Sequence, residues 1–238
     1  MRLAMWSGPR NLSTAMMYSF GNRADFHVVD EPFYGPYLRE TGLDHPMREE
    51  IIADRPDSAE EVAAALLGPI PDGKPHVYHK HMAQHMIPAM PRDWFGGCTH
   101  VFLIRHPARV VASFGAKYEN PTLEDIGFVQ QAELFETLRA AGQDPVVIDS
   151  ADIRQDPENM LRKLCTAIGL PFDPAMLSWP NGGHRQDGVW KEVWYASVHR
   201  STGFAGPEGP LPDLDGPAAE LAARALPYYD KMAAAALR

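Results

Sequence analysis

Two short segments combine cations and hydroxyl groups at points where a buried strand is expected to end. The first, residues 7–14, reads SGPRNLST and precedes an apolar helical stretch. The first N–H groups of a helix lack intrahelical partners, and the helix dipole adds partial positive charge there. With Arg10, Ser13 and Thr14 beside it, this segment predicts a phosphate-type anion site. An ordinary strand-to-helix turn with Ser13 as its N-cap is the alternative.

The second segment repeats this pattern after a stronger apolar run, residues 100–105, which ends in Arg105. Pro107 favours a first helical turn directly after it. Ser113 lies about two turns into that helix, where its hydroxyl could reach the same anion as Arg105. A surface salt bridge for Arg105 and a solvent-facing Ser113 are the alternatives for each residue alone. The two segments together predict a site for two phosphate groups.

The elements that must position these segments follow from the order of apolar runs. Strands are expected from residue 3 and at 27–29, 77–80, 100–105 and 145–149, and helices after Ser13, at 82–90, from 107, and at 123–141, 157–168 and 217–237. Short apolar runs that alternate with helical patterns indicate βαβ units. We therefore predict a three-layer α/β/α fold with a central, mostly parallel sheet of about five strands. Ligands of such sheets bind at the carboxyl ends of the strands.

Length and composition favour a single decorated domain, residues 1–238. A chain of 238 residues, 45% of them hydrophobic, can bury a full core. Residues 35–73 are polar and broken by prolines, so we expect a peripheral cap with helices near 46–53 and 58–67. Ser58 would be the N-cap of the second helix. Residues 171–212, rich in Gly, Pro and Trp, are expected to form an irregular tail over the site.

The charge and the apolar runs limit the classes of partner. A formal charge of -9 argues against a nucleic-acid-binding surface, which needs a contiguous basic stripe. We find no cationic leader and no run approaching the roughly 20 apolar residues of a membrane span. The expectation is a soluble, cytoplasmic protein that could form a homodimer. Cys98 and Cys165, without C-x-x-C spacing, are expected to be reduced core thiols.

Taken together, the two segments resemble the sulfotransferase family, whose members use 3′-phosphoadenosine 5′-phosphosulfate (PAPS) as the sulfuryl donor. Residues 7–14 are similar to the family's 5′-phosphosulfate loop. Residues 103–114, LIRHPARVVASF, are similar to its 3′-phosphate segment, in outline Arg-x-Pro-x-x-x-x-x-Ser-Phe. The resemblance extends from residue 1 to about 168. It implies a P-loop NTPase-like fold, PAPS as donor without a required metal, a small-molecule hydroxyl acceptor, and a donor site made of Arg10, Asn11, Leu12, Ser13, Thr14, Arg105 and Ser113.

Two alternatives to a sulfotransferase stay open. A P-loop nucleotide or small-molecule kinase normally carries G-x-x-x-x-G-K-[ST], but Gly8 is followed here by no Gly-Lys pair. A catalytically inactive nucleotide-binding module is the second alternative. Leu12 stands where many sulfotransferases have glycine, and the family's late basic glycine motif has only a weak counterpart, at residues 182–191.

Sulfuryl transfer to an alcohol needs a base for the acceptor proton and cations beside the departing phosphate. Glu31 ranks first, because some bacterial sulfotransferases use a glutamate from a comparable segment. Residues 79–85, HKHMAQH, resemble the Lys-x-His region that supplies the catalytic histidine of the eukaryotic cytosolic enzymes. His81 and His85 are therefore the other candidate bases, and Lys80 would assist at the leaving oxygen. Local pairing of Glu31 with a cation and helix capping by the histidines are the structural alternatives.

The same histidines admit a metal site. His81 and His85, at i and i+4 of the expected helix, would share one face, and His79 or Glu31 could complete the ligand set. The H-E-x-x-H pattern is absent, because methionine and alanine follow His81. We therefore expect no metal.

The acceptor is the least specified part of the prediction. Aromatic residues of the tail are expected to shape its pocket, and their other role would be to pack the tail onto the sheet. An aromatic pocket suits a sugar, a phenol or a lipid-like alcohol, and the sequence does not select among them. These residues are Trp179, Trp190, Trp194, Tyr195 and Phe204.

Overall fold

A five-stranded parallel sheet forms the centre of the computed structural model, which describes residues 1–115, 118 and 120–238. The strand order is β2-β3-β1-β4-β5, and every neighbouring pair is parallel. This arrangement confirms the predicted fold class. The strands are β1 (Arg2–Ser7), β2 (Phe26–Asp30), β3 (His76–Met82), β4 (Thr99–Ile104) and β5 (Val146–Asp149).

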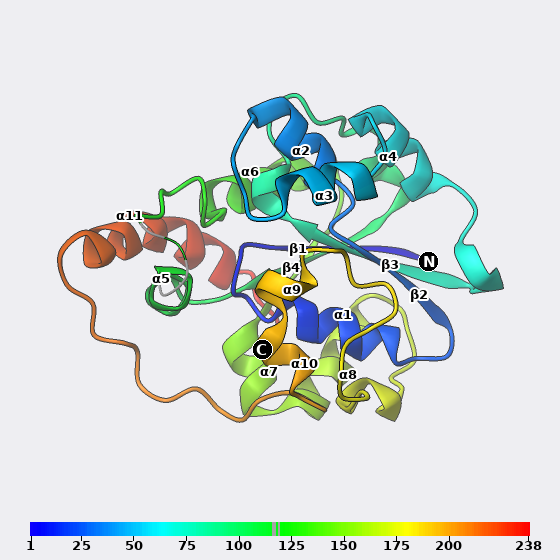
Figure 1. Cartoon of the computed structure of the whole chain (residues 1–238). Coiled ribbons are helices and arrows are strands. Elements are labelled where there is room, and N and C mark those ends of the chain that lie inside the picture. Colours follow the sequence, from blue (N-terminus) through cyan, green and yellow to red (C-terminus); the bar gives the residue numbers. More distant parts are fainter. Residues whose placement is uncertain (116–117, 119) are drawn as a thin grey trace.

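Helices cover both faces of the sheet (Figure 1). Figure 1 shows α2, α3 and α4 above the sheet and α1, α7 and α8 below it, while α11 packs against α5 and α6. No helix among the described residues is long and apolar enough to cross a membrane. The helices are α1 (Ser13–Gly21), α2 (Tyr34–Thr41), α3 (Arg48–Asp54), α4 (Ala59–Leu67), α5 (Pro107–Gly115), α6 (Phe128–Ala140), α7 (Ser150–Gln155), α8 (Pro157–Ala167), α9 (Lys191–Trp194), α10 (Ala196–His199) and α11 (Gly216–Ala233).

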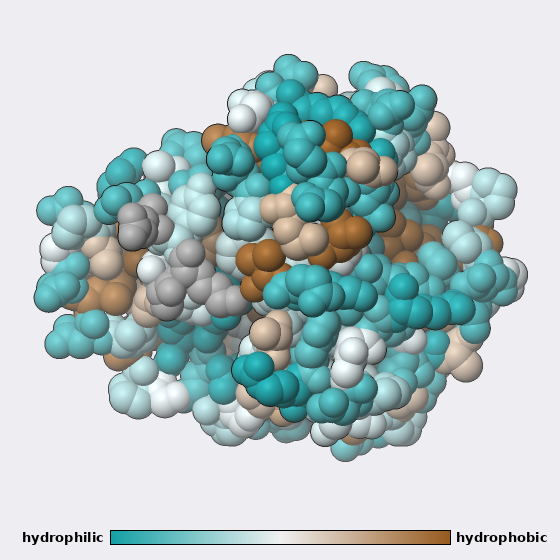
Figure 2. Space-filling view, viewed as in Figure 1, coloured by the Kyte–Doolittle hydropathy of each residue, from teal (hydrophilic) through white to brown (hydrophobic). Residues whose placement is uncertain are grey.

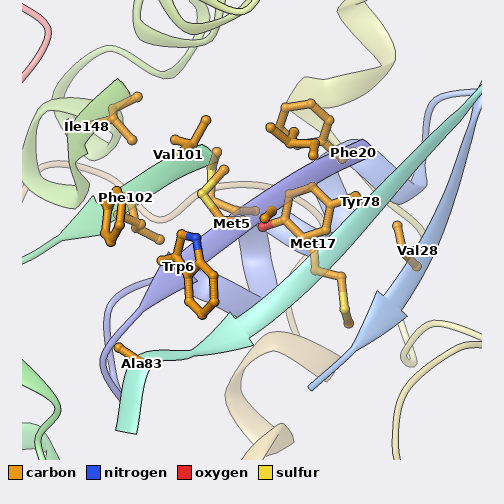
Figure 3. Packing of buried hydrophobic residues seen from close by; sticks show 14 of the residues in the cluster. Met5, Trp6, Met17, Phe20, Val28, Tyr78, Ala83, Val101, Phe102 and Ile148 are labelled. Carbon is orange, nitrogen blue, oxygen red and sulfur yellow. The ribbon is translucent and has the colours of Figure 1, made fainter. Parts of the chain in front are cut away.

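The central strand β1 is apolar throughout because both of its faces are covered. Met5 and Trp6 follow one another and project to opposite sides of the sheet, where both are fully buried (Figure 3). Met5 pairs in register with Val101 of β4, and Trp6 pairs with Phe102. Such continuous apolar runs are typical of parallel strands buried on two sides.

The strand order reverses beside β1, and this reversal positions the functional segments. The chain passes from β1 to β2 and β3 on one side of the sheet and then to β4 and β5 on the other. Ser7, the last residue of β1, is in register with Met82 of β3 and Leu103 of β4. The loops after these three strands therefore meet at one edge, at the switch point where parallel sheets bind ligands.

The predicted helix over residues 82–90 is wrong. β3 continues through Met82, because His81 and Met82 extend the parallel pairing with β1. Only a short 3₁₀ turn, Ala83–His85, follows it. Sheet pairing overrides the local helix propensity of this stretch. His81 and His85 therefore do not share a helix face, and the spacing argument for a metal site loses its basis.

Several helix boundaries also differ from the sequence expectation. α2 was not predicted, because it contains a glycine and a proline, and neither was the short helix α7. Helix α6 begins at Phe128 rather than at residue 123. In the cap, the predicted N-cap is confirmed, since Ser58 Oγ accepts from the N–H of Glu61 at 3.1 Å. The tail is not wholly irregular, because it holds a 3₁₀ turn (Pro174–Leu177) and the helices α9 and α10.

Both cysteines are free thiols, as predicted. Cys165 is buried, and Cys98 is half-buried. Burial raises the pKa of Cys98 to about 11. This thiol is therefore protonated at neutral pH, which argues against a nucleophilic role.

Buried histidines predict that the protein loses stability in mild acid. Burial lowers the pKa of His79 to about 3 and the pKa values of His81 and His85 well below their usual range. Histidines of the unfolded chain have a pKa of about 6.5, so below that pH the unfolded state binds protons that the folded state does not. Each such histidine lowers the free energy of unfolding by up to about 1.4 kcal/mol per pH unit. Circular-dichroism melts should show a midpoint that falls steadily between about pH 7 and pH 5.

The variant His81→Phe is the matched test of this explanation. His81 stacks on both Trp6 and Trp94, with ring centroids 4.5 Å and 5.1 Å away, so a phenyl ring suits the same position. We expect a shallower loss of stability in acid for this variant. A midpoint that is constant over the same pH range in the unmodified protein would contradict the prediction.

Candidate active site

A cavity of about 390 Å³ lies at the edge of the sheet where the loops after β1, β2, β3 and β4 meet. The surface in Figure 2 is largely hydrophilic, with hydrophobic residues gathered near the middle of this face. The cavity brings together most of the residues singled out in the sequence. These are Arg10, Asn11, Leu12, Ser13, Thr14, Glu31, Lys80, His85, Arg105 and Ser113.

His81 is the candidate that the fold does not bring to the cavity. Successive side chains of a strand point to opposite faces, and on β3 it is Lys80 and Met82 that line the cavity. His81 points the other way and is fully buried against Trp6 and Trp94. Its position favours a packing role over a role as the base.

The loop after β1 has an unusual backbone. Arg10 and Leu12 both have positive φ angles, of 62° and 69°. This conformation costs about 1–2 kcal/mol for a residue with a Cβ, and glycine adopts it freely. The left-handed conformation therefore gives a physical reason why glycine suits position 12. Asn11 helps to hold the loop, because its buried Nδ2 donates to the carbonyl of Leu103 at 3.2 Å.

The same loop leaves no room for a side chain at Gly8. A Cβ at this position would lie 2.6 Å from the carbonyl oxygen of Ile126. The loop is therefore packed closely against the segment before α6. Ser13, Thr14 and Ala15 follow as the first turn of α1, and all three line the cavity. The N-terminus of α1 thus faces the cavity with its unpaired N–H groups.

The two anion segments of the sequence contact each other directly. Arg10 Nε donates to Ser113 Oγ at 2.9 Å, and Arg105 Nη1 donates to the carbonyl of Arg10 at 2.7 Å. Burial, together with the charge of Arg105, lowers the pKa of Arg10. The loops after β1 and β4 therefore form one cationic site rather than two separate ones.

A carboxylate of the tail lies among three arginines behind this site. Glu208, with 4% of its side chain exposed, is 2.8 Å from Arg109 Nε and 2.7 Å from Arg154 Nη1. Arg105 donates to it as well, through Nε at 3.0 Å and through Nη2. Burial alone would raise the pKa of Glu208, but the bond from Arg105 and the charges of all three arginines hold it below its usual range. We name Arg105, Arg109, Arg154 and Glu208 the arginine cluster.

The sequence did not single out Arg109, Arg154 or Glu208. Arg154 lies on α7, which follows β5 and was not predicted, yet it lines the cavity beside Arg105. Glu208 lies in a tail segment without a motif, and residues 182–191 had been the nearest candidate there. The signal used to find cations in the sequence was a basic residue directly after a strand. Arg154 lies five residues after the end of β5, so this signal does not find it.

Lys80 is fully buried at the centre of a second polar group. Its Nζ lies 2.9 Å from Asp30 Oδ1, 2.5 Å from Glu31 Oε1 and 2.5 Å from the hydroxyl of Tyr195. Burial alone would lower the pKa of Lys80, but the charges and hydrogen bonds of Asp30 and Glu31 outweigh it and raise that pKa. Lys80 is therefore an ammonium ion at neutral pH.

Asp30 and Tyr195 complete this group, which we name the lysine cluster: Lys80, Asp30, Glu31 and Tyr195. The Tyr195 hydroxyl lies 2.9 Å from both oxygens of Asp30 and 3.2 Å from Glu31 Oε1. It also accepts from Trp190 Nε1 at 2.9 Å. Burial, and then the charges of Asp30 and Glu31, raise the pKa of Tyr195 well above its usual range. From the sequence, Tyr195 was expected in the acceptor pocket, and no role was predicted for Asp30.

His85 lies beside the second carboxylate oxygen of Glu31, Oε2. Its Nε2 is 4.0 Å from Glu31 Oε2, and its ring stacks on both Tyr34 and Tyr37 with centroids 4.5 Å and 4.8 Å away. Burial, and then the charges of His45 and Lys80, lower the pKa of His85 well below its usual range. Glu31 itself has a positive φ of 41°. Such strain at a non-glycine residue occurs often at functional sites.

Among the residues that the structure describes, no group of three or more His, Cys, Asp or Glu side chains is placed to hold a metal ion.

Two curated proteins of Arabidopsis thaliana are similar to this chain in sequence. "Branched-chain-amino-acid aminotransferase-like protein 1" is 36% identical over 230 residues, which cover 94% of this chain and 40% of that protein. "Branched-chain-amino-acid aminotransferase-like protein 2" is 34% identical over 203 residues, 85% of this chain and 36% of that protein. The chain therefore spans about two fifths of the length of these relatives, whose names describe much longer proteins.

Two solved structures of similar shape are sulfotransferase domains. The "Sulfotransferase Domain from the Curacin Biosynthetic Pathway" has a TM-score of 0.54 and 17% identity, with 93% of this chain and 96% of that chain covered. The "Sulfotransferase Domain from the Synechococcus PCC 7002 Olefin Synthase" has a TM-score of 0.51 and 18% identity, with 93% of each chain covered. At this identity the likeness concerns the fold, and it supports the expected P-loop-like architecture.

A family model described as "Sulfotransferase domain" matches residues 1–236. This match includes both anion segments, the cap and the tail, whereas the resemblance in the sequence extended only to about residue 168. The chain therefore belongs to the sulfotransferase-domain family.

Proposed function

We propose that this sulfotransferase-like protein transfers a sulfuryl group from PAPS to the hydroxyl group of a small-molecule acceptor. One observation carries the proposal. The loops after β1 and β4, which resemble the two phosphate segments of the family, contact each other through Arg10, Ser113 and Arg105 at the N-terminus of α1. The lysine cluster borders the same cavity.

The residues at this end of the cavity fit a donor with two phosphate-type groups. Arg10, Arg105 and Arg154 line it, and Glu208 is the carboxylate that pairs with the last two. The surplus of positive charge suits a strongly anionic ligand. The buried Ser150 Oγ has no hydrogen-bond partner among the described residues, and it lies on the cavity wall as a free donor.

We assign the donor's groups by analogy with the family. The first turn of α1, with Ser13, Thr14 and Arg10, would hold the phosphosulfate, and Arg105 with Ser113 would hold the 3′-phosphate. Bound PAPS supplies the sulfuryl group, whose bond to the 5′-phosphate breaks as its bond to the acceptor oxygen forms. Arg10 and the α1 N–H groups would stabilise the negative charge left on that phosphate.

Glu31 is the base that the arrangement of charges favours. Its Oε1 is bound by Lys80 and Tyr195, which leaves Oε2 for the proton of the acceptor hydroxyl. Lys80 is held as an ammonium ion, so it stabilises negative charge and does not accept the proton. The neutral ring of His85, 4.0 Å from Oε2, is the other group that can accept a proton there.

Calorimetry with 3′-phosphoadenosine 5′-phosphate, the product nucleotide, tests the proposal. We expect this nucleotide to bind more tightly than ATP, because the second phosphate has its own arginines. The variant Arg105→Ala should weaken its binding by about 10- to 100-fold, the effect of losing a hydrogen bond to a charged group.

Arg162→Ala is the matched control. Arg162 lies on α8, is half exposed and pairs with Glu158, so its removal should leave nucleotide binding unchanged. Tighter binding of ATP than of 3′-phosphoadenosine 5′-phosphate would contradict the proposal and favour the kinase alternative.

A further inference from the structure

The part of the cavity around His85 differs in character from the part near the arginines. Its walls are largely aromatic, and we name it the aromatic half. Tyr118 stacks on Phe114 with centroids 5.3 Å apart and lies 6.4 Å from the ring of His45, whose Nδ1 is 2.9 Å from the hydroxyl of Tyr34. The aromatic half is lined by Tyr34, Tyr37, His45, Phe114, Tyr118 and Trp194.

Carboxylates outnumber basic side chains in the aromatic half. Glu31 and Asp125 both line the cavity, and both lie close enough to His45 for their charges to act on its ring. Asp125 Oδ2 accepts from the backbone N–H and from the hydroxyl of Thr122, each at 2.8 Å, which fixes the position of this carboxylate. The cation here is Lys80, which is already bound by two carboxylates of the lysine cluster.

Four other titratable groups of this half, the rings of His45 and His85 and the hydroxyls of Tyr34 and Tyr37, are neutral at physiological pH. Burial lowers the pKa values of His45 and His85, so neither ring adds a positive charge. Burial, and then the charge of Asp125, raise the pKa of Tyr37 to about 12. Burial and the charge of Glu31 raise the pKa of Tyr34 as well. The aromatic half therefore holds more acidic than basic side chains.

We propose that the acceptor is a small alcohol that carries an ammonium or quaternary ammonium group close to its hydroxyl. The inference rests on the proposed function, because it assigns the aromatic half to the acceptor. Aromatic faces attract cations, and a desolvated cation gains most from such contacts. Asp125 supplies the opposite charge, while Glu31 at the other side receives the hydroxyl. An anionic acceptor would instead meet Glu31 and Asp125, with Lys80, which already pairs with Asp30 and Glu31, as the nearby cation.

A pair of matched probes tests the charge of the acceptor directly. Choline and 3,3-dimethylbutanol have nearly the same shape and the same hydroxyl, but carbon replaces the charged nitrogen in the second. We expect choline to bind the 238-residue chain at least about 10-fold more tightly than the neutral probe. Calorimetric titrations are made both with and without saturating 3′-phosphoadenosine 5′-phosphate.

Two kinds of variant locate the effect in the aromatic half. Asp125→Asn keeps the shape of the side chain and removes its charge, so the preference for choline should fall several-fold. Trp194→Phe keeps an aromatic face, and Trp194→Leu does not, so the preference should fall further in Trp194→Leu. Far-UV circular dichroism checks that each variant is folded. If a variant is not folded, the ratio of the affinities of the unmodified protein for choline and for 3,3-dimethylbutanol decides the inference.

The outcomes separate this inference from the proposed function. Equal or tighter binding of the neutral probe overturns the cationic acceptor, and so does the absence of binding by both probes. If either result accompanies normal binding of 3′-phosphoadenosine 5′-phosphate, the proposed donor stands. If the nucleotide fails to bind, the proposed function is overturned, and the titrations without nucleotide still decide whether the aromatic half selects a cation.

Discussion

Replacement of Glu31 by glutamine is expected to lower the turnover of sulfuryl transfer by about 10²- to 10⁴-fold, the usual contribution of a general base. Glutamine keeps the size of the side chain but cannot accept the acceptor proton at Oε2. The donor site is made of other residues, so binding of 3′-phosphoadenosine 5′-phosphate should change little. Transfer of labelled sulfate from PAPS to a panel of alcohols, together with calorimetry of the product nucleotide, measures both effects.

Two comparison variants make this prediction specific. Glu40→Gln alters an exposed carboxylate on α2 and should leave turnover unchanged. His85→Gln removes the other proton acceptor near Oε2, and we expect a smaller loss than in Glu31→Gln. A larger loss in His85→Gln, with near-normal turnover in Glu31→Gln, would assign the base to His85 instead.

Replacement of Lys80 by methionine is expected to destabilise the fold by about 3–5 kcal/mol. Methionine fills a similar volume but leaves the buried carboxylates of Asp30 and Glu31 without their shared cation. A loss of this size is large beside the total stability of a typical domain, about 5–15 kcal/mol. Urea unfolding followed by circular dichroism measures it as a lower midpoint.

The rest of the lysine cluster supplies the controls for that prediction. Tyr195→Phe removes only a hydroxyl from the same group, so it should cost about 1–3 kcal/mol. The double variant Asp30→Asn with Lys80→Met should be more stable than Lys80→Met alone, because one uncompensated charge is gone. A Lys80→Met protein as stable as the unmodified chain would show that the two carboxylates do not depend on this ammonium.

Patterns that are local in the chain were readable from the sequence. The apolar runs at β1 and β4, followed by Arg10 within three residues and by Arg105 directly, indicated parallel strands with anion sites at their carboxyl ends. Buried parallel strands and helix starts depend on neighbouring residues, so their signals survive in a single sequence. Ser58 as an N-cap was predictable for the same reason.

Patterns that depend on pairing across the fold were not readable. Residues 82–85 look helical, but the neighbouring strand β1 holds His81 and Met82 in the sheet. Because successive side chains of a strand point to opposite faces, Lys80 then points to the cavity and His81 to the core. The spacing of these residues along the chain does not show which of them faces the cavity. Register is a property of two strands, and one strand's residues do not specify it.

By itself, the sequence determined the α/β class, the parallel sheet and two anion-binding segments at strand ends, because each depends on residues that are adjacent in the chain. Only the tertiary structure decided how these segments combine. It joined Arg10 to Ser113, set Glu208 among the arginines, and completed the lysine cluster with Tyr195 from 115 residues away. Burial and long-range contact fix the charge of a group and its partners, and neither is encoded in local spacing.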